Sequence, residues 1–313
     1  MPRHLLSLLD LTREEILAVL DRAREMKKGP GIYRSRILEG KAIGLLFEKS
    51  STRTRVSFEV GAYDLGAHTI FLTPGVTQIG RGEPVKDTAR VLSRYVDAIV
   101  LRTGSQSILE EYAEWSTIPV INALSDLLHP CQILADLLTI LEKRGTLDGL
   151  EAAYVGDGNN VAHSWILASA RLGFRFRIAT PPAYAPSDEV LSKLDREQRS
   201  RVVVTRDPLE AVNGAHAIST DVWVSMGQEA ERDDRLEALA PYQLDARLVA
   251  LADPEALVLH CLPAHRGEEI TEDVMEGPHS VIFDQAENRL HAQKALLEFL
   301  MAEPEWKKKL ASR

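Results

Sequence analysis

A polar run that follows an apolar stretch early in the chain has the composition of an anion site. The sequence FEKSSTRTRVSF, residues 47–58, places Ser51, Thr52, Arg53 and Thr54 directly before an expected helix. Backbone N–H groups at a helix start, hydroxyl groups and guanidinium groups are the donors that hold phosphate. We therefore predict a phosphate cradle; the alternative is a polar helix cap with solvated arginines. The pattern GxxxxGK[ST] is absent, so nucleotide hydrolysis of that type is not indicated.

Two later segments supply further donors. Arg102 ends the apolar run AIVLR, and LLHPCQ places His129 and Gln132 at the start of a leucine-striped helix. Gathered beside a phosphate cradle, such groups could polarise a carbonyl oxygen. Taken singly, Arg102 is typical of a surface ion pair and His129 of a helix cap or a satisfied polar residue.

The segment GDGNN, residues 156–160, invites comparison with a dinucleotide-binding loop. The third glycine of GxGxxG would fall at Val161, and the end of the next expected strand has no acidic residue for a ribose. The sequence therefore argues against an NAD-dependent dehydrogenase. Asn159 and Asn160 suit hydrogen bonding to a small polar ligand, or a turn.

Two segments near the C-terminal end of the chain add a carboxylate and a thiol. STDVWVSMGQE contains Asp221, Ser225 and Met226, and LVLHCLPAHRGEEI places Cys261 and Leu262 at the end of an apolar strand. The first segment reads either as a ligand loop or as a solvated surface loop. Cys261 reads either as an inert core residue or as a partly accessible thiolate.

The elements that must position these residues alternate along the chain. Thr12 and Glu15 form an expected capping box before the first helix. Strands are expected at 41–47, 68–72 and 98–102, followed by helices from about Thr54, at 87–96 and at 108–115. A second series of strands is expected at 150–156, 174–180, 201–205, 215–220, 256–262 and 280–285, with helices from about 162 and at 288–301.

This alternation predicts an α/β fold with two doubly wound parallel-sheet domains in series, joined by helices, with the active site in the cleft between them. The leucine-striped helix ILADLLTILEK followed by RGTLDG places the domain hinge near residue 140. We expect one domain at 1–140 and a second at 141–287. We also expect a C-terminal helix, 288–313, that packs back on the first domain.

Composition excludes several classes of function. The 313 residues carry a formal net charge of −9, and the sequence pI is about 5.6. Nucleic-acid binders need clustered Lys and Arg residues to meet phosphates, so this acidic composition argues against that class. No apolar stretch reaches membrane-spanning length, so no membrane partner is expected. The two cysteines are too few for a disulfide framework. These features favour a cytoplasmic protein with small-molecule ligands.

Taken together, six stretches resemble the aspartate/ornithine carbamoyltransferase family. FEKSSTRTR, LRT, HPCQILADLLT, GDGNNVAHS, DVWVSMGQE and HCLPAHRGEEI occur in the family's order over essentially the whole chain. The resemblance implies transfer of the carbamoyl group of carbamoyl phosphate to the δ-amine of L-ornithine, giving L-citrulline and phosphate. HPCQ, the SMG loop and HCLP favour the ornithine branch over the aspartate branch; putrescine and N-acetylornithine remain alternative substrates.

The resemblance also implies roles for individual residues. Domain 1–140 would bind carbamoyl phosphate and domain 141–287 ornithine. The carbamoyl phosphate residues would be Ser51, Thr52, Arg53, Thr54, Gln78, Arg102, His129, Gln132, Cys261, Leu262 and Arg289. Ornithine would be held by Asn160, Asp221, Ser225 and Met226, and the catalytic residues would be Cys261, Arg102, His129 and Asp221.

In the family, the position of Gln78 belongs to a loop that reaches a neighbouring subunit's site, and relatives carry histidine there. The resemblance therefore implies a homotrimer with sites shared between subunits. No metal or organic cofactor is expected, because the leaving group is already activated and arginines can neutralise it. A non-catalytic phosphate-binding protein of the same fold is the other class left open.

Overall fold

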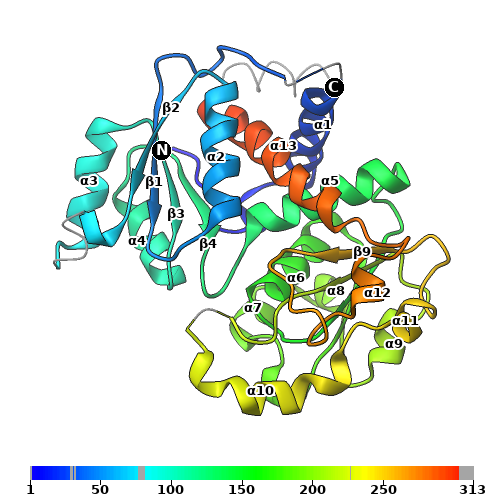
Figure 1. The fold of residues 1–313 in the computed structure, drawn as a ribbon. Helices are drawn as coiled ribbons and strands as arrows, with labels where there is room; N and C mark the ends of the chain where they lie inside the picture. The colour runs from blue at the N-terminus through cyan, green and yellow to red at the C-terminus, as the bar shows by residue number, and fades with distance from the viewer. Residues whose placement is uncertain (1, 29–30, 32, 77–81, 226, 303–313) are drawn as a thin grey trace. The chain divides into compact units, whose positions relative to one another are not determined.

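The computed structural model describes residues 2–28, 31, 33–76, 82–225 and 227–302. The described residues of Met1–Leu138 and Asn288–Arg313 form one unit, and Thr139–Glu287 form a second (Figure 1). Each unit is built on a parallel sheet whose strands alternate with helices. The predicted fold class of two parallel-sheet α/β domains is therefore confirmed.

The sheet of the first unit has the strand order β2-β1-β3-β4, and each neighbouring pair is parallel. Its strands are β1 (Ala42–Phe47), β2 (His68–Leu72), β3 (Ala98–Arg102) and β4 (Val120–Leu124). The connecting helices are α2 (Thr52–Asp64), α3 (Val85–Tyr95) and α4 (Gln106–Trp115). The central strands read AIGLLF and AIVLR, which is the near-continuous apolar pattern of strands buried on both faces.

The strand order reverses between β1 and β3. The chain leaves β1 to form β2 on one side and then returns to form β3 on the other side. Phe47 at the end of β1 is in register with Arg102 at the end of β3, so the loops that follow leave the sheet side by side. In open α/β sheets this point of reversal, beyond the carboxyl ends of the strands, is where ligands bind.

The second unit repeats this principle with the strand order β7-β6-β5-β8-β9. Its strands are β5 (Glu151–Val155), β6 (Arg175–Ala179), β7 (Val202–Thr205), β8 (Ala217–Thr220) and β9 (Leu257–His260). Its helices are α6 (Asn160–Leu172), α7 (Asp188–Leu191), α8 (Arg196–Ser200), α9 (Pro208–Val212), α10 (Arg232–Leu239), α11 (Ala246–Val249) and α12 (Glu272–Met275). The order reverses between β5 and β8, so the loops after these strands are neighbours.

Three longer helices complete the framework. They are α1 (Arg13–Lys27), α5 (Pro130–Arg144) and α13 (Ile282–Met301). The predicted capping box of α1 is confirmed, because the Thr12 hydroxyl accepts from Glu15 N and the Glu15 carboxylate accepts from Thr12 N. Short 3-10 helices are η1 (Leu8–Asp10), η2 (Pro74–Val76), η4 (Pro182–Tyr184), η5 (Glu229–Glu231) and η6 (Ala240–Tyr242).

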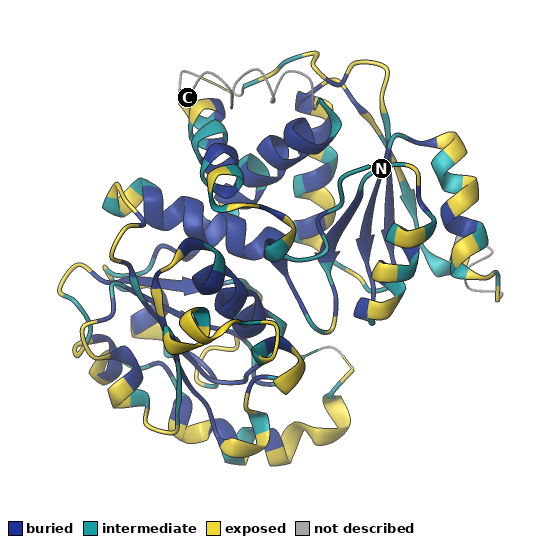
Figure 2. Ribbon diagram, turned by 180° about the vertical axis from the view of Figure 1, so that it is seen from behind, coloured by how far each residue is buried: buried dark blue, intermediate teal, exposed yellow. Residues whose placement is uncertain are grey.

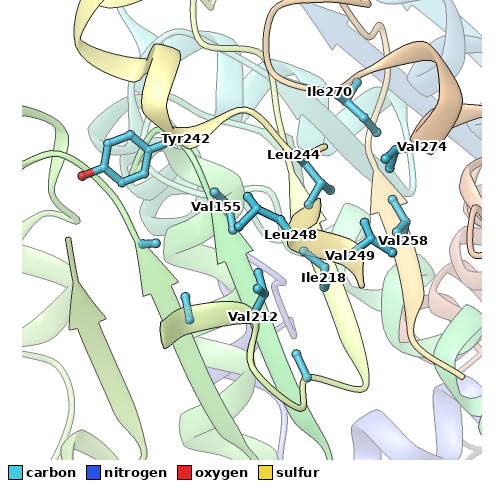
Figure 3. Packing of buried hydrophobic residues seen from close by; sticks show 14 of the residues in the cluster. Val155, Val212, Ile218, Tyr242, Leu244, Leu248, Val249, Val258, Ile270 and Val274 are labelled. Atoms are coloured by element: carbon cyan, nitrogen blue, oxygen red, sulfur yellow. The ribbon is translucent and has the colours of Figure 1, made fainter. Parts of the chain in front are cut away.

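Each unit has a core of its own. In the second unit, aliphatic side chains from the sheet and from α9, α11 and α12 pack together with Tyr242 at one margin (Figure 3). Ile218 of β8 and Val258 of β9 are fully buried in this cluster. In the first unit the corresponding cluster includes Ile99 and Leu101 of β3 and Leu109 of α4. Strands are buried throughout most of both sheets, and exposed residues gather on the outer helices (Figure 2).

Two sequence-based expectations differ from the structure. The strand predicted at 280–285 is wrong, because α13 begins at Ile282 and only an isolated bridge joins Ser280 to Val258. The apolar residues after Ser280 are β-branched and aromatic, but the buried positions 282, 285, 288, 289 and 292 follow a helical period. Strand β4 was not predicted, because Asn122 interrupts its apolar run.

Helix α13 is held to the first unit by buried charges. Lys294 is fully buried, and its Nζ donates to Asp64 Oδ2 at 2.9 Å and to the Tyr33 carbonyl at 2.8 Å. Arg22 of α1 pairs with Glu298 at 3.0 Å. A buried charge is tolerated when a counter-charge and hydrogen bonds satisfy it, so these pairs specify where α13 packs.

In the part of the chain that the structure describes, no helix combines the length and the apolar character needed to cross a membrane.

Candidate active site

The polar run after β1 forms the N-terminus of α2. The Ser51 hydroxyl is the N-cap and accepts from Thr54 N at 3.3 Å. This leaves the first backbone N–H groups of a 13-residue helix directed away from the helix body, where an anion is stabilised. Thr54 is buried and Thr52 is exposed, so the run presents one hydroxyl inward and one to solvent.

Arg289 of α13 reaches the same helix start. Its Nη2 donates to Thr54 Oγ1 at 3.1 Å, and its Nη1 donates to Gln132 Oε1 at 2.6 Å. Gln132 in turn donates from Nε2 to Asp136 Oδ1 at 2.8 Å. All of these groups are buried, so residues widely separated in sequence form one continuous hydrogen-bonded chain.

His129 lies within this group of cations. It is almost fully buried just before α5, and Arg102 is buried at the end of β3. Burial lowers the pKa of His129 well below its usual value, and the charges of Arg289, Arg102 and Arg53 lower it further. His129 is therefore a neutral imidazole at neutral pH. We call the set Ser51, Thr52, Arg53, Thr54, Arg102, His129, Gln132 and Arg289 the arginine site.

The second arginine of the polar run, Arg55, has different partners. Its guanidinium carbon lies 3.7 Å from the centre of the Phe71 ring, and its Nε donates to Glu59 at 2.9 Å. These residues line a cavity of about 600 Å³ together with Ser51 and Thr52. Of the two arginines in STRTR, Arg53 is thus the one whose charge reaches His129.

In the second unit, Asp221 directly after β8 gathers three donors. Its Oδ2 accepts from Asn159 Nδ2 at 2.7 Å, while its Oδ1 accepts from Val222 N at 2.8 Å and from the Cys261 thiol at 3.0 Å. Asp221 is buried and Cys261 is partly exposed. The structure therefore brings together the loops after β5, β8 and β9. We call Asn159, Asn160, Asp221, Ser225, Cys261 and Leu262 the Asp221 site.

Asn159 contacts the Asp221 carboxylate through its side-chain amide. Its Oδ1 caps α6 by accepting from Val161 N at 2.9 Å and from Ala162 N at 3.3 Å, which leaves Nδ2 to donate to the carboxylate. Asn160 is the first residue of α6 and is half-buried. The signal for Asn159 in the sequence is an N-cap residue directly before a helix start.

The turn that carries Cys261 is held by hydrogen bonds of the buried residues His260 and Glu269. His260 Nδ1 accepts from Leu262 N at 2.9 Å, and His260 Nε2 lies 3.0 Å from Glu269 Oε1. Since Nδ1 is an acceptor, Nε2 carries the proton and donates to Glu269. Leu262 has φ of 58°, which lies in the left-handed region. Residues other than glycine uncommonly adopt this conformation.

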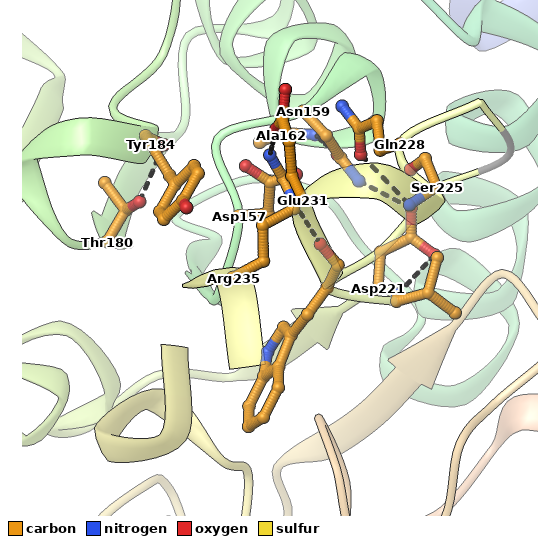
Figure 4. A network of polar contacts seen from close by, with 12 residues as sticks. Asp157, Asn159, Ala162, Thr180, Tyr184, Asp221, Ser225, Gln228, Glu231 and Arg235 are labelled. Carbon is orange, nitrogen blue, oxygen red and sulfur yellow. Dashed lines mark hydrogen bonds and ion pairs between the residues drawn. The ribbon is translucent and has the colours of Figure 1, made fainter. Parts of the chain in front are cut away.

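The segment from Asp221 to Ser225 is attached to α10 by Arg235. The Arg235 Nε donates to the Trp223 carbonyl at 2.7 Å, and its Nη2 pairs with Asp157 in the loop after β5 (Figure 4). Arg235 also lies over the Tyr184 ring at 4.4 Å. Ser225 N and Gln228 Oε1 are hydrogen-bonded at 3.0 Å, so the described part of this loop closes on itself. The contact between Arg235 and Asp157 was not expected from the sequence, because the two residues lie 78 positions apart.

The two glycines of GDGNN serve backbone packing. Gly156 has φ of 133°, a conformation that L side chains rarely adopt. A Cβ on Gly158 would lie 2.5 Å from the Tyr184 carbonyl oxygen and 2.6 Å from Pro186 N. Residues 184–186 therefore lie against this loop, which agrees with the sequence-based argument against a dinucleotide site.

Asp221, His260 and Cys261 each offer a potential metal ligand, and these atoms lie within 4.8 Å of one another. Both ring nitrogens of His260 already have partners, Leu262 N and Glu269. A metal ion at this cluster would have to replace one of these hydrogen bonds, so the arrangement fits a hydrogen-bonded network better than a metal centre.

The structure thus groups the predicted residues into two sets, one in each unit. Gln78 and Met226, which were also predicted as site residues, lie outside the described residues. Arg55, the second arginine of the polar run, is directed to Phe71.

The lowered pKa of His129 predicts a pH dependence of stability. A histidine held neutral in the folded state takes up a proton below about pH 6.5 only when the chain unfolds. Its contribution to the free energy of unfolding is therefore present above that pH and is lost as the pH falls, by up to about 1.4 kcal/mol per pH unit. We expect His129→Gln to flatten this dependence between pH 6.5 and 5 in urea unfolding experiments. Equal slopes for the two proteins would contradict the assignment.

Comparisons with known proteins match two successive parts of the chain. The sequence family described as aspartate/ornithine carbamoyltransferase, carbamoyl-P binding domain, matches residues 3–142, and its Asp/Orn binding domain matches residues 148–300. Ornithine carbamoyltransferase from Methanoculleus marisnigri is 54% identical over 304 residues, which is 96% of this chain and 98% of that protein. The Gloeobacter violaceus enzyme of the same name is 56% identical over 300 residues, 95% of each chain.

Solved structures give the same result. Ornithine carbamoyltransferase from Pyrococcus furiosus is 48% identical with a TM-score of 0.90 and covers 96% of this chain and 97% of its own. The anabolic ornithine carbamoyltransferase from Campylobacter jejuni is 40% identical, also with a TM-score of 0.90, over 96% and 99% of the two chains. With both domain families matched in order and over nearly the full length, the chain belongs to the aspartate/ornithine carbamoyltransferase family.

Proposed function

We propose that this protein transfers the carbamoyl group of carbamoyl phosphate to the δ-amine of L-ornithine, which gives L-citrulline and phosphate. The observation that carries this proposal is the arginine site, in which a neutral imidazole and three guanidinium groups gather at the start of α2. Such a set suits a ligand that combines an anionic phosphate with an uncharged carbonyl group. The family membership and the ornithine carbamoyltransferase names of the relatives support ornithine as acceptor.

In this proposal, residues 1–140 with the C-terminal helix from 288 bind carbamoyl phosphate, and residues 141–287 bind ornithine. The names of the matched family domains support this division. The matched Asp/Orn domain extends to residue 300, but Lys294 and Glu298 bond to Asp64 and Arg22, so we assign this helix to the first domain.

The phosphate would be held by Ser51, Thr52, Arg53 and Thr54. Backbone N–H groups at the positive end of α2 stabilise its charge, and Arg53 neutralises it further. Phosphate is the leaving group. The same contacts therefore stabilise the charge that develops on phosphate as the bond between the carbamoyl carbon and the bridging oxygen breaks. This chemistry needs no metal or organic cofactor.

The carbonyl oxygen of the carbamoyl group would accept from Arg102, His129 and Thr54. A neutral His129 still donates one N–H, and it does so without adding a fourth positive charge to the arginine site. Donors aimed at the oxygen of a tetrahedral intermediate are each worth about 3 to 4 kcal/mol of transition-state stabilisation. Arg289 and Gln132, which hold each other at 2.6 Å, would close this part of the site.

Ornithine would be held by Asn160, Asp221, Ser225 and Met226, with Asn159 fixing the Asp221 carboxylate. Cys261 and Leu262 would line the reacting centre beside carbamoyl phosphate. The amine is nucleophilic only when neutral. An unperturbed alkylamine has a pKa near 10.4, so presenting it neutral at pH 7 costs about 4 to 5 kcal/mol. A proton acceptor beside the amine lowers this cost.

The contact between Cys261 and Asp221 supports a relay for that proton. As the amine nitrogen forms its bond to the carbamoyl carbon, its N–H bond breaks and the sulfur accepts the proton. In the same step the thiol proton passes to Asp221 Oδ1, which it already faces at 3.0 Å, so the sulfur never carries two protons. A free thiolate beside a carboxylate is disfavoured by like charge, and the relay avoids forming one.

The first experiment measures carbamoyl transfer from carbamoyl phosphate to ornithine, putrescine, N-acetylornithine and aspartate in parallel. We expect turnover with ornithine, because the Asp221 site and the ornithine branch motifs fit that amine. Preference for another amine would keep the phosphate role and overturn the assignment of the acceptor. If no amine gives a product, the alternative of a non-catalytic phosphate-binding protein is favoured. In a separate titration with NAD(H), a change in nicotinamide fluorescence would favour the alternative of a dehydrogenase.

The relay predicts the behaviour of Cys261→Ser. A thiol with a reference pKa near 8.5 exchanges protons more readily than a hydroxyl, so the substitution should lower kcat and change the pH profile of kcat. Steady-state rates from pH 6 to 10 with saturating substrates test this. An unchanged kcat with an unchanged profile would exclude Cys261 as proton acceptor.

We further propose a homotrimer with sites shared between subunits and a cytosolic location. Exposed apolar side chains on α2 support association: Val56, which lines the cavity with Ser51 and Thr52, is 50% exposed, and Tyr63 near the other end of the helix is 67% exposed. Burying such side chains in a subunit contact is favourable. The two cysteines are both free, as in a reducing compartment.

Light scattering on the purified protein should give the mass of three chains. A shared site also predicts complementation between two weakened variants. Subunits with Arg102→Leu mixed with subunits carrying Gln78→Ala should regain activity, because some hybrid sites then combine an intact Arg102 with an intact Gln78. Activity that equals the average of the separate variants would argue against sharing.

A further inference from the structure

Glu48, the residue that follows β1, connects the two loops that carry the arginine site. Its backbone N–H donates to the Arg102 carbonyl at 2.9 Å and extends the β1–β3 ladder by one step. Its side-chain Oε2 accepts from the Thr103 hydroxyl and from Gly104 N, the latter at 3.2 Å. One residue thus fastens the segment that leads to Ser51 to the segment that contains Arg102.

On its other edge, β3 pairs with β4, and this pairing is irregular near Arg102. Pairing between β3 and β4 shifts by one residue at Leu101 and Arg102, because Leu101 opposes Asn122 whereas Arg102 opposes Leu124. The extra residue is Ala123 of β4, so β4 is the strand that bends, while Arg102 stays in register with Phe47 of β1. The ladder resumes at Thr103 N, which donates to Leu124 O at 3.1 Å. Thr103, which Glu48 holds by its hydroxyl, is therefore the first residue fixed from both sides after the bulge.

The charge of Glu48 works against anion binding. Its carboxylate lines the same cavity as Ser51 and Thr52, and both donors to its Oε2 are neutral. A negative charge near a phosphate site raises the free energy of the bound anion. The contribution of Glu48 to this site therefore has to come from the geometry that its two hydrogen bonds impose.

We propose that Glu48 is a positioning residue that sets the separation between the start of α2 and Arg102. This inference rests on the proposed function. In carbamoyl phosphate a single bridging oxygen joins the phosphorus to the carbamoyl carbon, so contacts to both groups must keep a fixed spacing. Glu48 supplies that spacing, since it links Arg102 and Thr103 to the chain three residues before Ser51.

The chain contains a matched control at the other end of the same strand pair. Asp97 directly before β3 accepts from Ala42 N at 2.9 Å and from Lys41 Nζ at 2.8 Å, and its own N–H donates to the Ala42 carbonyl at 2.7 Å. Both carboxylates thus join β1 to β3. Only Glu48 lies at the carboxyl ends of the strands, where the arginine site is found.

The test compares Glu48→Ala with Asp97→Ala by kcat, by KM for carbamoyl phosphate and by the inhibition constant of inorganic phosphate. Misplacing a catalytic group by about 1 Å costs roughly 100-fold, so Glu48→Ala should lower kcat by roughly 10- to 100-fold. Phosphate inhibition should remain near the wild-type value or become tighter, because the start of α2 is intact and an opposing charge is gone. Asp97→Ala should lower the melting temperature and leave kcat and phosphate inhibition near wild type.

Two further variants complete the design. Glu48→Gln keeps an oxygen that can accept from Thr103 and Gly104, so it should recover most of the kcat lost in Glu48→Ala. Thr103→Val removes only the hydroxyl link and should lower kcat in the same direction by less, which tests the proposal even if Glu48→Ala fails to fold.

Three results would overturn the inference: an unchanged kcat in Glu48→Ala, an equal loss in Asp97→Ala, or weaker phosphate inhibition that parallels the loss of kcat. Absence of turnover in the wild-type protein would instead overturn the proposed function, so the two failures are distinguishable.

Discussion

Parallel pairing at the two points of strand reversal is the constraint on which the rest of this structure depends. In the first unit β1 and β3 end together, and in the second β5 and β8 end together. Each reversal delivers two loops to one edge of a sheet without any contact between side chains. The polar residues then need only short loops to meet, which explains why Glu48 contacts Arg102 in one unit, and Asn159 contacts Asp221 in the other, despite their separation in sequence.

Burial gives these neighbours their chemical character. Arg102, His129 and Arg289 are each less than a tenth exposed, so water screens their charges poorly and each strongly affects the others. Burial keeps the imidazole neutral and the guanidinium charges add to this effect, while Gln132 joins Arg289 to Asp136. In the Asp221 site the buried carboxylate is satisfied by neutral donors instead of by cations. These donors are an amide, a backbone N–H and a thiol.

Much of the fold could be predicted from the sequence because apolar strands and helical periods are local signals. The runs AIGLLF and AIVLR gave correct strands, and Thr12 with Glu15 gave a correct helix start. The strand predicted at 280–285 was wrong because six residues are too few to distinguish a helical period from a strand pattern. The family motifs brought in most site residues, but not the contacts between them. Asn159, Arg235 and Glu48 act through partners that lie 55 to 78 positions away, and no local pattern specifies such pairs.

The C-terminal helix has a consequence for how the chain is made. Arg289 supplies hydrogen bonds to Thr54 and Gln132, and Lys294 neutralises Asp64, so the first unit lacks essential partners until the last residues have been synthesised. The second unit, Thr139–Glu287, contains all of its own strands and core before that point. During translation, which adds about 5 to 20 residues per second, the later unit can reach its native packing while the earlier one still waits. We expect the order of folding to be the reverse of the order of synthesis, and truncation of α13 to disable the part of the protein that the ribosome makes first.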